Sequence, residues 1–176
     1  MRRAVAVVPL FLASFAAWGH PADAAGFVHP FTGLDHLLAM LAVGLWAAQL
    51  GGRWTWALPL AFVGSLSLGG ALGFAGVALP YVEPMIAVSV LVLGLLVSLK
   101  VRLHWSGVAL VGTFALFHGI AHAAEIPPQV SRIVYAGGFI LATALLHAAG
   151  VALGLLPRAR WAGVPVALAG LWLLAS

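Results

Sequence analysis

Long apolar stretches, separated by short clusters of charged residues, proline and glycine, run through most of the 176 residues. This pattern predicts an all-α polytopic transmembrane bundle of six spans, because lipid offers the backbone no hydrogen-bond partner and only helices satisfy it locally. The spans are expected at about 33–50, 54–79, 85–99, 105–124, 133–156 and 161–176. Most reach the roughly 17 to 25 residues that cross a hydrocarbon layer, whereas 85–99 and 161–176 are marginal.

The N-terminus carries the features of a secretory signal peptide. Arg2 and Arg3 precede an apolar run, and small residues follow in the stretch Ala-Asp-Ala-Ala at 22–25. A basic start, a short apolar stretch and an A-x-A-like site are typical of a cleaved signal. We therefore expect residues 1–25 to be removed and 26–176 to form a single six-helix domain, with an uncleaved first helix as the alternative.

Composition narrows the classes of function. The chain is 64% hydrophobic and only 7% charged, so lipid must cover most of its surface. The net charge of +4 comes from few, scattered basic residues and predicts no nucleic-acid partner. The chain has no cysteine, so any metal site must use nitrogen and oxygen ligands. It also has no GxxxxGK[ST] motif, which excludes ATP hydrolysis by a P-loop in this chain.

The loop charges predict the orientation in the membrane. All but one of the basic loop residues fall in alternate loops, and the exception is Arg132. Positive charge is retained in the cytoplasm, which places those loops inside and the start of the first span outside, where a cleaved signal would deliver it. We therefore expect a bacterial inner-membrane protein with both mature termini in the periplasm. The residues on the predicted cytoplasmic side are Arg53, Lys100, Arg102, Arg158 and Arg160.

Ionisable residues gather in two short segments. The first reads HPFTGLDH at 29–36, and the second reads FHGIAHAAE at 117–125. If a helix begins near Pro30, His29 and His36 lie seven residues apart and share a face, with Asp35 one residue off it. In the second segment the histidines and the glutamate follow i, i+4, i+7 spacing and also share a face. Both segments fall near the predicted outer ends of their spans.

Imidazole and carboxylate ligands together suit zinc, copper, nickel, cobalt or iron, and they disfavour magnesium and calcium. Ionisable side chains inside a membrane are costly and usually functional, so two such clusters at one depth favour a metal site. The alternative is hydrogen bonding between packed helices, which is the simpler interpretation of His147 alone. We retain His147 as a candidate second metal station, and His104 as an ordinary loop residue.

The two segments resemble the signature motifs of the HupE/UreJ family, the hydrogenase- and urease-associated nickel permeases. Ala123 stands where the second motif usually has glycine, a departure that removes no ligand. The resemblance implies a secondary permease that moves nickel, with cobalt as a second candidate, from periplasm to cytoplasm, with no permanently bound cofactor. It also implies the metal residues, which are His29, Asp35, His36, His118, His122 and Glu125.

Other classes of function remain open from the residues alone. An intramembrane metalloprotease would use the i, i+4 histidines of an HExxH motif, but Gly119 occupies the position of the catalytic glutamate. A metal oxidase, a metal sensor or a structural partner of a larger transporter are further alternatives. The expected partners are the metal ion and the lipid bilayer. A second copy of the chain is a candidate protein partner.

Overall fold

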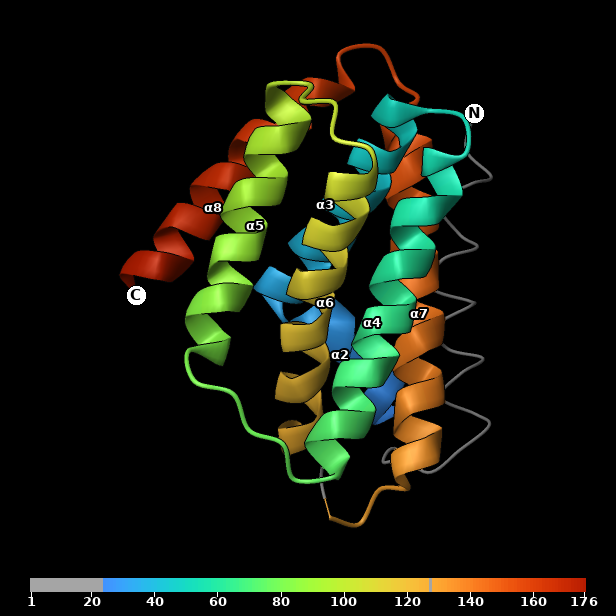
Figure 1. The fold of residues 1–176 in the computed structure, drawn as a ribbon, viewed down its shortest axis with the longest axis vertical. Coiled ribbons are helices and arrows are strands. Elements are labelled where there is room, and N and C mark those ends of the chain that lie inside the picture. Colours follow the sequence, from blue (N-terminus) through green and yellow to red (C-terminus); the bar gives the residue numbers. More distant parts are fainter. Residues whose placement is uncertain (1–23, 127) are drawn as a thin grey trace, which may run out of the picture.

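A computed structural model describes residues 24–126 and 128–176 as a bundle of helices with no strand in that part of the chain (Figure 1). The predicted signal segment lies almost wholly outside these residues. The long helices α3 to α8 run alternately up and down the bundle. In chain order the elements are α2 (Ala25–Thr32), α3 (Leu34–Leu50), α4 (Trp54–Phe74), α5 (Val82–Ser98), α6 (Trp105–Glu125), α7 (Arg132–Gly154), the 3-10 helix η1 (Ala159–Ala162) and α8 (Gly163–Ala175).

Among the described residues, three helices, α4, α6 and α7, are long and apolar enough to cross a bilayer. The pair α2 and α3 makes a fourth candidate if it counts as one bent span, and α5 and the C-terminal helix are shorter apolar helices. The all-helical membrane fold is therefore confirmed, whereas the count of six spans stays a prediction. Helix α4 ends at Phe74, short of the expected 79, and the chain turns at Gly76 with a φ of 88°.

The first predicted span, 33–50, matches α3, but the segment before it bends away instead of continuing that helix. Helices α2 and α3 meet at 84°, so the expectation of a continuous helix from Pro30 is wrong. The backbone is extended at Gly33, with φ −86° and ψ 116°, and Pro30 lies inside α2 rather than at a first helical position. The side chain of Thr32 donates to the carbonyl of His29 at 2.8 Å, which closes the last turn of α2.

Helices α4 and α6 pack with their backbones in contact. A Cβ atom added at Gly69 would lie 2.3 Å from the carbonyl oxygen of Leu116, and one added at Gly119 would lie 2.1 Å from that of Leu66. Small residues permit such close approach in lipid, where helix association depends on packing. Gly119 stands between the two histidines of the second motif, so this contact also fixes how those histidines face the bundle.

Gly73 and Gly64 of α4 differ in how closely they approach a neighbouring helix. A Cβ added at Gly73 would lie 2.5 Å from the Cβ of Ala123, so α4 supplies a glycine opposite the residue that departs from the family motif. Gly64 has open space around its Cβ position. Gly73 therefore packs closely against α6, whereas Gly64 meets no neighbouring helix in the described structure. The same close approach recurs between α3 and α7, where a Cβ at Gly44 would lie 2.2 Å from the carbonyl oxygen of His147.

Charged residues separate along the bundle. The loops that follow α3, α5 and α7 lie at one end, and they carry the basic residues expected in the cytoplasm (Figure 1). The three acidic residues that the structure describes are placed toward the other end: Asp35 and Glu83 are in the first turns of their helices, and Glu125 ends α6. Arg132 begins α7 at that same end, with its guanidinium 5.3 Å from the ring centre of Phe74.

The contact between α4 and α6 makes Gly119→Ala destabilising. The added methyl group would meet the backbone of α4, which cannot move aside as a flexible side chain can, so we expect a loss of about 1–3 kcal/mol. The matched control is Gly64→Ala, a helical glycine with open space around it. Thermal melting of the purified protein in detergent should show a lower midpoint for Gly119→Ala only. Equal midpoints would contradict the packing.

Candidate metal centre

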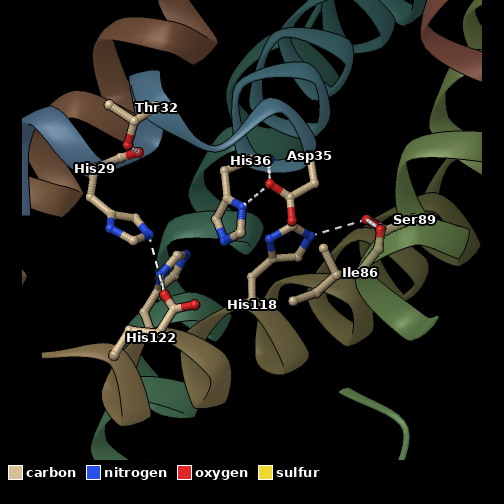
Figure 2. Close-up of polar contacts among 9 residues, drawn as sticks. His29, Thr32, Asp35, His36, Ile86, Ser89, His118 and His122 are labelled. Atoms are coloured by element: carbon tan, nitrogen blue, oxygen red, sulfur yellow. Dashed lines mark hydrogen bonds and ion pairs between the residues drawn. The ribbon is translucent and has the colours of Figure 1, made fainter. Parts of the chain in front are cut away.

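Three histidines from three different helices meet inside the bundle. His29 comes from α2, His36 from α3 and His122 from α6, and one ring nitrogen from each lies within 4.8 Å of the others (Figure 2). The side chains of His36 and His122 are almost fully buried, each with about 5% of its surface exposed. We call this group the His29–His36–His122 cluster. Its spacing is small enough for one ion to contact all three rings.

The ring of His36 is oriented by its neighbour in the chain. One carboxylate oxygen of Asp35 accepts the backbone N–H of His36 at 2.8 Å and also contacts Nδ1 of its ring. A carboxylate can only accept a hydrogen bond, so the proton of the neutral ring is on Nδ1. The buried Nε2 has no hydrogen-bond partner among the described residues and keeps its lone pair for an ion. Carboxylates hold metal-binding histidines in this way in many proteins.

The carboxylate of Glu125 orients two imidazole rings, those of His122 and His29. Its Oε2 atom lies 3.1 Å from Nδ1 of His122 and 3.2 Å from Nε2 of His29, so it links the end of α6 to α2. Because the carboxylate accepts from Nδ1 of His122, the Nε2 atom of that ring carries the lone pair, and it too is buried without a partner in the described chain. Helix α2 packs mainly against α7, and this link adds a polar connection from α2 to the end of α6.

A fourth imidazole lies deeper. The ring centre of His118 is 5.0 Å from that of His36, and its side chain is fully buried. The hydroxyl of Ser89 donates to the carbonyl of Ile86 at 2.6 Å, so its single proton is used there. It must therefore accept the Nε2–H of His118, at 3.0 Å, which leaves the lone pair on the unpartnered Nδ1 atom.

Ser89 was not identified from the sequence. It is one of two serines in the apolar helix α5, and its position opposite His118 depends on how α5 packs beside α6. The available signal was a polar residue on a helix that otherwise has mostly aliphatic residues. Its complete burial would call for a hydrogen-bond partner on a neighbouring helix.

The structure brings the six predicted metal residues together, although not in equivalent positions. His36, His118 and His122 each have a buried ring nitrogen with no partner among the described residues, whereas the part-exposed His29 is paired with Glu125 through Nε2. The carboxylates of Asp35 and Glu125 contact the Nδ1 atoms of His36 and His122. The role of each as a ligand stays a prediction. The two other histidines considered in the sequence analysis lie outside the cluster. His104 stacks on Trp54, with ring centres 4.9 Å apart, and His147 contacts Phe62, whose ring also contacts His118.

At the acidic end of the described bundle, two recesses lie beside the carboxylates that contact the cluster, and no histidine lines either of them. One, of about 390 Å³, is lined by residues that include Asp35 and Glu83, and another, of about 400 Å³, is lined by residues that include Glu83 and Glu125. Carboxylates at the entrances raise the local concentration of cations. The apolar ring of Phe139 packs against the imidazole of His122, with ring centres 4.0 Å apart. The arrangement can attract a divalent cation and remove water from it.

The fold and this centre together define a helical membrane protein with a buried histidine cluster suited to a divalent transition metal. Comparison with known proteins specifies the family: residues 5–173 match the HupE / UreJ protein family, and the chain belongs to it. Members of this family are hydrogenase and urease accessory transporters rather than enzymes, so the enzymatic alternatives are set aside.

One curated relative shows the extent of the similarity. The chain is 48% identical over 158 residues to Protein HupE of Rhizobium leguminosarum bv. viciae, which covers 85% of this chain and 83% of the relative. No solved structure matches the chain.

Ser89→Ala tests the geometry of the centre. Without the hydroxyl, His118 loses the acceptor that fixes its tautomer, and we expect affinity for nickel to fall about 10- to 100-fold. Calorimetric titration of the purified protein in detergent measures this. The matched control is Ser98→Ala on the same helix, whose hydroxyl donates to the carbonyl three residues earlier but touches no histidine. Unchanged affinity in Ser89→Ala would separate Ser89 from the metal site.

Proposed function

We propose that this protein is a secondary permease that moves nickel, with cobalt as a second candidate, from the periplasm to the cytoplasm. The observation that carries the proposal is the His29–His36–His122 cluster, whose ring nitrogens lie within 4.8 Å inside an apolar bundle. Buried imidazoles with free lone pairs have no purpose in a simple packing interface, where each would bond a neighbouring helix. A transported ion supplies their missing partner.

The chemistry of the cluster supports a late first-row metal. Imidazole ligands suit nickel, cobalt, copper and zinc, and the described residues offer too few oxygen ligands for calcium or magnesium. Membership of a family of hydrogenase and urease accessory transporters favours nickel within this group, because those enzymes need that metal. The ion is substrate rather than cofactor, so the site must bind tightly enough to capture it and weakly enough to release it.

The separation of charge supports inward transport across the inner membrane. Cations in the loops after α3, α5 and α7 would remain in the cytoplasm by the positive-inside rule. The acidic end and its two recesses would then open to the periplasm, where the ion arrives. The 84° break between α2 and α3 fits this function, because secondary transporters often build their ion sites at interrupted helices.

Loss of the cluster should abolish uptake. In His36→Ala and His122→Ala the ion loses a nitrogen ligand that no neighbouring side chain replaces, so uptake of radioactive nickel by cells that express these variants should fall to the level of cells without the protein. His104→Ala, which removes a histidine at the opposite end of the bundle, should transport normally. Membrane-fraction immunoblots check that each variant inserts. Normal uptake in both cluster variants would refute the assignment of the site.

The orientation predicts where the C-terminus lies. With α8 running from the basic end toward the acidic end, a reporter fused after Ser176 should face the periplasm. An alkaline phosphatase fusion, which is active only after export, should be active. A fusion in the loop between α5 and α6, near Arg102, should be inactive. The reversed result at both positions would place the acidic entrances in the cytoplasm and contradict uptake in the proposed direction.

A further inference from the structure

Helix α7 carries three buried polar side chains for which the described chain provides no partner: Tyr135 in its first turn, and Thr143 and His147 further along. His147 is 2% exposed and Thr143 is fully buried. Neither ring nitrogen of His147 has a hydrogen-bond partner among the described residues, and the hydroxyl of Thr143 has none either. Buried polar groups in folded proteins are nearly always hydrogen-bonded, so an unpaired imidazole and hydroxyl on one helix need an explanation. Being four residues apart, they share a face of α7.

These two residues lie on the cytoplasmic side of the histidine cluster. Phe139, one turn before Thr143, contacts His122 with ring centres 4.0 Å apart. Along α7, Thr143 and His147 follow at about 6 Å and about 12 Å toward the basic end. The ring of Phe62 on α4 contacts both His118, at 5.7 Å, and His147, at 5.0 Å between ring centres. His147 is therefore the next imidazole that an ion would meet beyond His118.

Packing does not account for the imidazole. The close approach of α3 to α7 at this level depends on Gly44, which faces the backbone carbonyl of His147 rather than its ring. A recess between α4 and α7 also reaches His147, and it is lined mainly by apolar side chains such as Pro59, Val63 and Val151, which offer no hydrogen bond. An aliphatic side chain would fill the space of the ring without leaving a polar group unpaired.

We propose that His147 and Thr143 form a second, weaker metal station that receives the ion from the His29–His36–His122 cluster. The inference rests on the proposed transport function and extends it with a site and a sequence of steps. One imidazole nitrogen and one hydroxyl oxygen suit the same late first-row divalent metals as that cluster. Their small number makes binding loose, and a loosely held ion can move on toward the cytoplasm.

His147→Leu and Thr143→Val test the station. Calorimetric titration of the purified full-length protein with nickel should give two binding events in the wild type. His147→Leu should lose the weaker event and keep the stronger one, whereas His36→Ala should lose the stronger one. Initial nickel uptake into liposomes should fall about tenfold or more in His147→Leu, because the ion then has no ligand between the cluster and the exit. Thr143→Val should also slow uptake, and Thr143→Ser should restore it.

The controls separate a metal station from a packing role. Thr113→Val removes the hydroxyl of an exposed threonine on α6, which donates to the carbonyl of Ala109, and should leave binding and uptake unchanged. Thermal melting in detergent checks that each variant is folded. If His147→Leu does not insert into the membrane, the comparison of Thr143→Val with Thr143→Ser still tests the station. Two binding events and normal uptake in both variants would overturn the station while leaving the permease intact. A wild-type protein that takes up no metal would instead overturn the proposed function.

Discussion

A helix that breaks inside a membrane exposes backbone groups that lipid cannot bond, so the protein must satisfy them itself. At the break between α2 and α3, the hydroxyl of Thr32 and the amide of Gly33 both donate to the carbonyl of His29, at 2.8 Å and 3.3 Å. The metal centre depends on this bend. In a straight helix His29 would stand about 10 Å from His36 along the axis, too far for one ion to contact both. With the 84° bend their ring centres are 5.8 Å apart.

The positions of His118 and His122 depend on how closely α6 approaches α4. Gly119 brings the backbone of α6 against α4, and this contact turns His118 and His122 toward the interior. Glu125 then joins α6 to α2 through the imidazoles of His122 and His29. The same residues thus connect the short helix to the end of α6 and prepare the ligands. Since rigid partners preorganise a metal site, a small shift of α4 against α6 should disturb binding as much as loss of a ligand does.

The sequence predicts the helical class and most helix boundaries, because long apolar runs bounded by charge allow few other structures in lipid. It also predicts which residues gather, since ionisable groups are too costly in a membrane to be scattered. It did not predict the break, because Pro30 fits the first turn of a helix as well as the short α2. The partnership of Ser89 with His118 was equally hidden, since it depends on which helices become neighbours. The pattern of apolar residues determines which side chains are buried, but it does not determine which helix they pack against.

Charge balance explains how one bundle could both capture and release an ion. At the His29–His36–His122 cluster, the carboxylates of Asp35 and Glu125 contact the Nδ1 atoms of neutral imidazoles. Their two negative charges nearly neutralise a divalent cation bound there. At the proposed inner station the partners on α7 are an imidazole and a hydroxyl, and the described structure places no carboxylate in contact with them. An ion that moves inward leaves its neutralising charges behind and rises in free energy, because an uncompensated charge is costly in an apolar interior. The inner station therefore binds the cation more weakly than the outer residues do, and the cation can leave it toward the cytoplasm without being trapped.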